Sequence, residues 1–167
     1  MPASPSTAPE SSAAAVGPAA TAEADAIALV RLSHVIRDTF TRVAERHDLT
    51  PVQARMLCVL AERPYGMAEL ARLFGVGKAN LTGLVDRAAQ RRLVERSLVP
   101  GDRRAVQVVL TEDGRQSALA FHTAVTEELA GLLSPLTPQA RADLRRSAAA
   151  VAEAAGPPGT RPGHPAC

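Results

Sequence analysis

The apolar positions of this chain repeat every three or four residues over long stretches, and this spacing places them on one face of an α-helix. In residues 22–46 this face consists of Leu29, Leu32, Ile36, Phe40 and Val43. Two further helices are predicted at about residues 112–133 and 138–154, and the apolar residues in and between them are Leu119, Val125, Leu129, Leu132, Leu133, Leu136, Leu144 and Val151. The pattern therefore predicts long amphipathic helices at both ends of the chain.

Capping residues indicate where several of the helices begin. In the segment Thr50–Gln53, a Thr, a Pro and a Gln occupy the positions of a capping box, so a helix is expected from there to about residue 62. Thr111 precedes two acidic residues, which stabilise the first turn of a helix through its dipole. Thr137 followed by Pro138 predicts one more helix start.

Residues 67–88 have the pattern of a helix-turn-helix. A small residue at Ala71 permits close helix contact, Gly75 supplies a left-handed turn, and Leu81 is placed to dock the second helix. On that second helix the inward face is Leu81, Leu84, Val85 and Ala88, and the outward or partly outward positions are Lys78, Ala79, Thr82, Gly83, Asp86 and Arg87. A short positive and polar face of this kind suits the major groove of DNA.

Two β-prone runs follow, at residues 94–99 and 105–110, joined by a turn at residues 100–104. They predict a hairpin in which Val106, Val108 and Leu110 face inward. The turn carries Arg103 and Arg104, whose forked donors suit phosphate or a minor groove. Asp102 is expected to hold a neighbouring arginine, for which Arg96 is the candidate.

Residues 1–21 and 156–167 are rich in Ala, Pro, Ser, Thr and Gly, so both are predicted to be disordered tails around one domain at residues 22–155. The terminal helices have more apolar surface than so small a domain covers. Burial between two subunits is the favoured solution, which predicts a homodimer, and a closed monomeric bundle is the alternative. Because no apolar run approaches about 20 residues and no signal peptide is evident, the expected location is the cytoplasm.

The net charge of +2 is unevenly distributed along the chain. Residues 63–115 contain ten Lys and Arg against six Asp and Glu, which favours a polyanionic partner over a merely solvated surface. With only four aromatic residues, the chain lacks the stacking platform of single-strand binders. No phosphate loop, nucleophile elbow or paired catalytic carboxylate stands out, so we expect neither an enzyme nor a cofactor.

The cysteines and histidines are candidates for redox, metal or effector sites. Cys58 has apolar neighbours, which favours an inert core thiol over a redox sensor, and Cys167 falls in the predicted tail. The histidines lack metal-ligand spacing, so no metal site is expected. His34, Arg37 and Arg55 are candidates to bind an anionic effector, and the alternative for the arginines is salt bridging to nearby acids.

From about residue 49 to 114 the chain resembles the MarR (multiple-antibiotic-resistance regulator) winged-helix transcription regulators. The resemblance rests on residues 67–71, 81–87, 93–96, 101–104 and 109–114, and an Asp-Arg-Arg wing followed by Leu-Thr-x-x-Gly is quite specific to that family. It implies a mainly α fold with a small β-hairpin wing. It also implies dimerisation helices at residues 22–48 and 112–155 around a winged helix-turn-helix at 49–111, and a small effector, often phenolic or anionic, bound between them.

The chain departs from the family pattern in two places. Gly77 and Ala79 occupy positions that are often Ser, so DNA contacts are expected to depend on Lys78, Asn80, Thr82 and Arg87, together with the wing. Arg92 occupies a position that is usually Gly. Either the turn there differs, or it is left-handed and strained by about 1 kcal/mol in return for an added positive charge.

These observations together predict a sequence-specific regulator of double-stranded DNA, most simply a ligand-responsive repressor that binds a pseudo-palindromic operator as a homodimer. The alternative is a winged-helix dimer that binds proteins instead of DNA. The operator, the effector, the target genes, the choice between repression and activation, and the redox activity of Cys58 are left open by the sequence.

Overall fold

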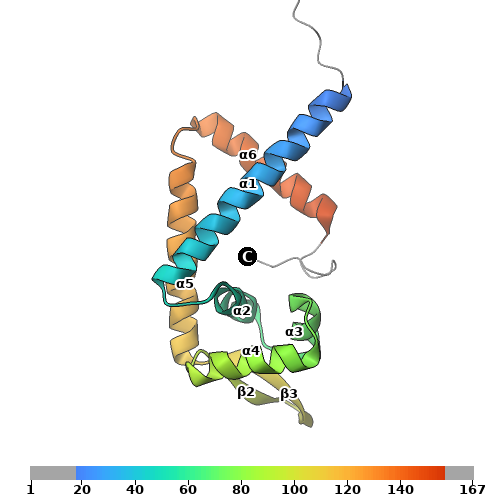
Figure 1. Cartoon of the computed structure of the whole chain (residues 1–167), viewed down its shortest axis with the longest axis vertical. Helices are drawn as coiled ribbons and strands as arrows, with labels where there is room; N and C mark the ends of the chain where they lie inside the picture. The colour runs from blue at the N-terminus through green and yellow to red at the C-terminus, as the bar shows by residue number, and fades with distance from the viewer. Residues whose placement is uncertain (1–17, 157–167) are drawn as a thin grey trace, which may run out of the picture. The chain divides into compact units, whose positions relative to one another are not determined.

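The computed structural model describes residues 18–156, without the side chains of Arg103 and Arg104. The chain divides into two units, residues up to 35 and residues from 36 onward, and each is described by itself. The elements are α1 (Pro18–Arg46), α2 (Pro51–Glu62), β1 (Tyr65–Gly66), α3 (Met67–Phe74), α4 (Lys78–Gln90), β2 (Val94–Val99), β3 (Asp102–Leu110), α5 (Glu112–Leu132) and α6 (Pro138–Ala155) (Figure 1). The predicted class, mainly helical with a small β-hairpin, is confirmed.

The three capping predictions are also confirmed. The Thr50 hydroxyl accepts from the Gln53 backbone N–H at 3.2 Å, and the Gln53 side chain accepts from the Thr50 N–H at 3.0 Å. The Thr111 and Thr137 hydroxyls accept from backbone N–H groups three residues on. Each bond satisfies a donor that the first turn of a helix leaves without a partner, so local sequence fixes where α2, α5 and α6 begin.

The sheet is antiparallel in the order β1–β3–β2. Its hairpin turn is shorter than predicted, because Val99 pairs with Asp102 and Gly101 has the left-handed φ of 87°. Val106 was predicted to face inward with Val108, but its side chain is 41% exposed. It lies on the same face two residues nearer the tip, where it pairs with the exposed Leu98 and is not covered by the core.

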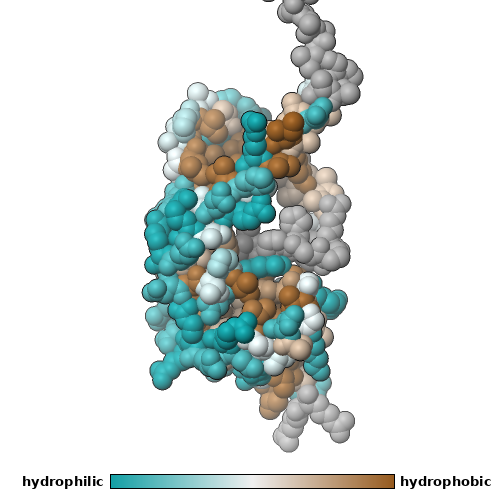
Figure 2. Space-filling model, viewed as in Figure 1, coloured by the Kyte–Doolittle hydropathy of each residue, from teal (hydrophilic) through white to brown (hydrophobic). Residues whose placement is uncertain are grey.

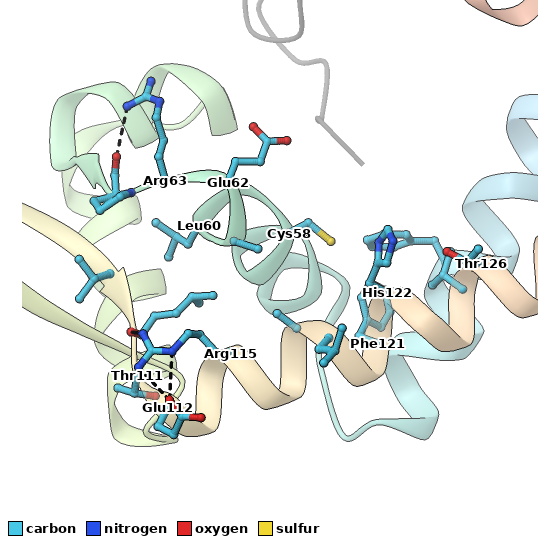
Figure 3. Close-up of a pocket in the computed structure, with 18 of the residues that line it drawn as sticks. Cys58, Leu60, Glu62, Arg63, Thr111, Glu112, Arg115, Phe121, His122 and Thr126 are labelled. Carbon is cyan, nitrogen blue, oxygen red and sulfur yellow. Dashed lines mark hydrogen bonds and ion pairs between the residues drawn. The ribbon is translucent and has the colours of Figure 1, made fainter.

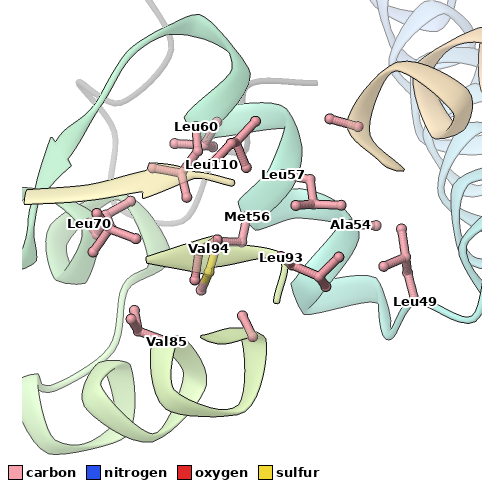
Figure 4. Packing of buried hydrophobic residues seen from close by; sticks show 14 of the residues in the cluster. Leu49, Ala54, Met56, Leu57, Leu60, Leu70, Val85, Leu93, Val94 and Leu110 are labelled. Carbon is pink, nitrogen blue, oxygen red and sulfur yellow. The ribbon is translucent and has the colours of Figure 1, made fainter. Parts of the chain in front are cut away.

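One core joins α2, α3, α4 and the sheet to α5 and the end of α1. Its buried residues include Leu57, Leu70 and Val85, and Figure 4 shows side chains of α2 meeting those of α4 and the strands. Phe40 of α1 and Phe121 of α5 pack edge to face with their ring centres 4.7 Å apart. This packing holds the end of α1 and the first half of α5 to the rest of the second unit.

An ion-pair cluster reinforces the same junction at the surface. The Glu128 carboxylate of α5 accepts from Arg42 at 2.8 Å and from Arg46, both on the last turns of α1. The hydrogen bond from Arg42, and to a smaller extent that from Arg46, lowers the pKa of Glu128 below its usual value.

The remaining helical surface is not covered by the described residues of the chain. Residues 21–35, the part of the first unit whose exposure is described, are exposed throughout, and they include Leu29 and Leu32; α6 contains no buried residue. Figure 2 shows apolar side chains, in brown, on the helical segment that leads to the grey N-terminal trace. Helix α1 begins at Pro18, four residues before the expected start, and residues 1–17 and 157–167 of the predicted tails lie outside the described residues.

Candidate nucleic-acid interface

Helices α3 and α4 form the predicted helix-turn-helix. Gly75 ends α3 with a φ of 64°, and the N–H groups of Gly75 and Val76 donate to the Arg72 and Ala71 carbonyls at 3.1 Å. This left-handed turn is the geometry that favours glycine. Within α4, Leu81, Val85 and Ala88 are buried, as the inward face requires.

The opposite face of α4 is open to solvent. Lys78, Asn80 and Arg87 are exposed, and among the described residues neither the Lys78 ammonium nor the Arg87 guanidinium has a hydrogen-bond or ion-pair partner. Thr82 is half-buried, and its hydroxyl donates to the Lys78 carbonyl at 2.9 Å. The hydroxyl proton of Thr82 is therefore used within the helix, and its lone pairs and methyl group remain for contact with a partner.

Two other arginines near α4 are held by the protein itself. Arg91 follows α4 and donates to the Asp48 carbonyl and, at 3.0 Å, to the Gln53 side chain, which joins the end of the helix to the α2 cap. Arg96 of β2 forms a 2.7 Å ion pair with Asp86 of α4. These cations therefore position α4, whereas Lys78 and Arg87 are available to a ligand.

The Arg96 pair differs from the prediction, which named Asp102 as the partner. The strand register places Arg96 opposite Val108 and Asp102 opposite Val99, so three residues, or roughly 10 Å, separate them along the hairpin. Asp86 lies on the helix next to β2 and is closer. The pair fixes the wing to α4 directly, a contact between two elements that periodicity along either one does not reveal.

The wing contributes Arg103 and Arg104, which lie in β3 directly after the turn. Only their backbone is described, so their contact with a nucleic acid stays a prediction. Asp102 is exposed at the start of the same strand. The hairpin brings these residues to its tip, as the sequence predicted.

The base of the wing resolves the two alternatives for Arg92. Its φ is 56°, its N–H donates to the Ala89 carbonyl at 2.9 Å, and its carbonyl accepts from the Thr111 hydroxyl. The turn is thus left-handed, with an arginine where glycine is favoured. Just beyond it, a Cβ at Gly114 would lie 1.8 Å from the Leu93 carbonyl oxygen, so only glycine lets α5 begin this close to the wing.

Of the three effector candidates, Arg55 is held by the protein itself. Arg55 donates to the Leu73 carbonyl at 2.6 Å, and its guanidinium lies 4.5 Å from the centre of the Phe74 ring, so it ties α2 to the end of α3. Burial lowers the pKa of this guanidinium. Arg37 is exposed in the second unit, and His34 is exposed in the first.

A cavity of about 1040 Å³ lies elsewhere in the second unit, between the end of α1, α2, α5 and the sheet. Its walls are mainly apolar, with Phe40 and Phe121 among them, and Arg37 and Arg55 are not part of them. Figure 3 shows His122 and Cys58 at this cavity. The sequence did not single out His122 as an effector contact, because nothing local indicates that α5 faces α2 at that point.

Two arginines of the cavity wall already have acidic partners. Arg63 pairs with Glu69 and lies over the Tyr65 ring at 3.8 Å, and Arg115 pairs with Glu112 at 3.0 Å. The pKa of Glu112 is lowered, mainly by its hydrogen bond with Arg115. In residues 18–156 no group of His, Cys, Asp and Glu is arranged to hold a metal ion, and no described helix is long and apolar enough to cross a membrane.

Comparison with known proteins agrees with this geometry. A sequence model described as the MarR family matches residues 47–105, which run from before α2 into β3. Over this segment the winged helix-turn-helix of this chain is similar to the MarR family. The matched segment contains Lys78, Arg87 and the two wing arginines.

The curated relatives that this chain matches are transcriptional repressors. It is 44% identical over 68 residues to the HTH-type transcriptional repressor NicR of Pseudomonas putida, an alignment that covers 40% of this chain and 43% of NicR. It is 31% identical over 90 residues to the homoprotocatechuate degradative operon repressor of Escherichia coli, covering 53% and 61% of the two chains. The chain therefore spans about half the length of the curated relatives it matches.

Solved structures extend the likeness to most of the chain. Apo MarR from Escherichia coli is 28% identical with a TM-score of 0.62, over 74% of this chain and 96% of that one. RV1404 from Mycobacterium tuberculosis is 28% identical with a TM-score of 0.67, over 88% and 100%. A MarR-family protein from Bacillus stearothermophilus, at 20% identity and a TM-score of 0.75 over 86% and 100%, supports the fold alone.

Proposed function

We propose that this protein is a transcriptional repressor that binds double-stranded DNA as a homodimer. The observation that carries the proposal is the outward face of α4, where Lys78 and Arg87 have no partner among the described residues although neighbouring arginines are paired. Unpaired cations on the outward face of a helix that the protein otherwise holds firmly are well placed to bind a polyanion. The repressor relatives support the same function.

In this proposal α4 enters the major groove and the β2–β3 wing follows the adjacent backbone into the minor groove. Lys78 and Asn80 lie at the start of α4, where recognition helices meet base edges and phosphates. Thr82 offers its lone pairs and methyl group, and Arg103 and Arg104 supply sequence-independent contacts. Two subunits would present two such helices about 34 Å apart to a pseudo-palindromic operator.

The dimer proposal depends on the uncovered apolar residues of the terminal helices. Leu29 and Leu32 of the first unit and Val151 of α6 are all more than 40% exposed. Mutual burial between two copies removes such residues from water without any further protein. The proposed domain plan is therefore a winged helix-turn-helix flanked in sequence by dimerisation helices.

The decisive experiment measures binding to duplexes that the full-length protein selects from a randomised library. If several phosphates per subunit are neutralised, the logarithm of the affinity falls steeply and linearly with the logarithm of salt concentration. Arg103→Ala or Arg104→Ala should weaken binding to all sequences and lower this slope, and Thr82→Ala should alter sequence preference. A flat salt response would instead favour binding to an acidic protein, and wing variants that bind as tightly as the parent would contradict the proposed docking.

The cavity of the second unit is the proposed effector site, and it suits a small aromatic compound with an anionic or phenolic group. Its aromatic walls suit a ring, and His122 and Thr126 are polar groups in its lining that form no ion pair in the described part of the chain. Arg63 and Arg115 are already paired, so we assign the polar contact to His122. Benzoate and 4-hydroxybenzoate, tested for release of the selected duplex and for a rise in melting temperature, are suitable first probes.

His122→Ala should abolish that response, and Arg37→Ala, which lies outside the cavity wall, is the matched control. An equal response in the parent and His122→Ala, or its loss in Arg37→Ala, would contradict the assignment of the effector to this cavity.

A further inference from the structure

Gly83 occupies the middle of α4, where glycine destabilises a helix relative to alanine. Neither backbone nor core explains its presence. Its φ is not in the left-handed region, and the only atom within 4 Å of the place a Cβ would occupy is the Nη1 of Arg87, at 3.4 Å. Gly114 is different, because there the Leu93 backbone excludes any side chain. The space above Gly83 is filled by an arginine side chain and by nothing else.

The position of the Arg87 guanidinium follows from helix geometry. Side chains on a helix lean toward its N-terminus, so a long residue covers the turn before its own Cα, four residues earlier. Arg87 therefore extends over Gly83 and brings its charge back toward the middle of the outward face of α4. Arg91, one turn further on, is held by the Asp48 carbonyl and the Gln53 side chain instead.

We propose that Gly83 is a positioning residue for sequence recognition, because it leaves the slot in which the Arg87 guanidinium lies along α4. This inference rests on the proposed DNA-binding function and deepens it. A guanidinium recognises guanine through two parallel hydrogen bonds to O6 and N7, and both require the planar group to be presented in one orientation. A Cβ alone would touch the guanidinium at 3.4 Å, but a longer side chain at residue 83 would occupy its place and displace it from that orientation, and Arg87 would then contact phosphate or no atom of the DNA.

The test compares Gly83→Gln, Arg87→Ala and the double variant in the full-length protein. Gln is a good helix former, so Gly83→Gln should raise the melting temperature by about 2–4 °C. The affinity for the duplex selected by the parent should nevertheless fall roughly tenfold, with loss of the preference for guanine at one position in each half-site. A residue with a merely structural role would not raise stability and lower affinity together.

The double variant shows whether Gly83 affects DNA binding through Arg87. If Gly83 acts through Arg87, the double variant binds no more weakly than Arg87→Ala alone. Additive losses would overturn the proposal, because they would mean that residue 83 approaches the DNA independently. Gly66→Gln at the N-cap of α3, where φ is −68° and nothing lies within 4 Å of the Cβ position, is the control and should leave duplex affinity unchanged.

The outcomes separate this inference from the function on which it rests. If the parent protein enriches no duplex from the library, the proposed function is wrong, and the role of Gly83 is wrong with it. If the parent enriches a duplex and Gly83→Gln binds it with the same affinity and the same guanine preference, the positioning role alone is overturned.

Discussion

The winged helix-turn-helix and the terminal helices differ in where their apolar residues lie. In the first region Leu70, Leu81 and Val85 are completely buried in one core. In the second, residues 21–35 are exposed throughout and α6 buries no residue, although both have apolar side chains at helical spacing. The comparison teaches that an apolar stripe predicts a helix but not the surface that covers it. In the first region that surface belongs to the same chain, and in the second no described residue supplies it.

The largest effect is expected where α5 leaves the winged helix-turn-helix. Gly114→Ala places a methyl group 1.8 Å from the Leu93 carbonyl oxygen, and this backbone has no room to move without opening the core. We expect the free energy of unfolding, measured by urea denaturation, to fall by about 3 kcal/mol or more. Gly131→Ala, in the same helix with open space around it, should not destabilise the protein. Equal stability of the two variants would mean that the start of α5 does not pack against the Leu93 carbonyl.

The next prediction tests the uncovered stripe directly. Leu32→Glu replaces a side chain that is 45% exposed in one chain and should not unfold it, but each symmetric dimer would lose two buried leucines. At about 1.5–3 kcal/mol for each, the dissociation constant should rise at least about 100-fold, measured by sedimentation equilibrium. Val106→Glu changes a similarly exposed residue of the wing and should leave the dimer intact. A monomeric parent protein, or two variants with equal dissociation constants, would contradict the claim that the apolar stripe of α1, unlike the wing, is buried between two subunits.

Much of the fold follows from the sequence because its signals are local. The capping box at Thr50 and the left-handed Gly75 depend on neighbours within a few residues, so both could be predicted. The two-residue strand β1 was missed, because its pairing with Val108 involves residues more than 40 positions apart. Side-chain partners depend on the same distant register, and the partner of Arg96 is therefore Asp86 where sequence proximity favoured Asp102.

The candidate site was predictable in part for a similar reason. Helical periodicity identifies the outward positions of α4, including Lys78 and Arg87. It does not distinguish a cation that the protein holds from one that is available, and Arg91 looks no different from Arg87 in the sequence. The family resemblance implied an effector site between the terminal helices and the winged helix-turn-helix, but not its lining, because the cavity beside His122 forms only when α2 and α5 pack together.

The contrast between those two arginines gives a third prediction. Arg91→Ala removes hydrogen bonds to the Asp48 carbonyl and the Gln53 side chain, and we expect a loss of about 1–2 kcal/mol in the free energy of unfolding. Arg87→Ala, one turn earlier on the same helix, should leave stability nearly unchanged, because no described group accepts from it. Thermal denaturation of both variants checks this, and an equal loss would mean that Arg87 is also held by the protein.

The smallest effect is expected at Arg92, within the well-packed region. Its left-handed backbone should cost about 1–2 kcal/mol, which is partly offset because an arginine has less freedom than glycine in the unfolded chain. Arg92→Gly should therefore stabilise the protein by about 0.5–1 kcal/mol, whereas Arg92→Ala, which removes the charge but keeps the Cβ, should not. If both variants bind the selected duplex more weakly at low salt, the strain is retained for the positive charge beside the wing. If neither does, the arginine has no role in binding and only lowers stability.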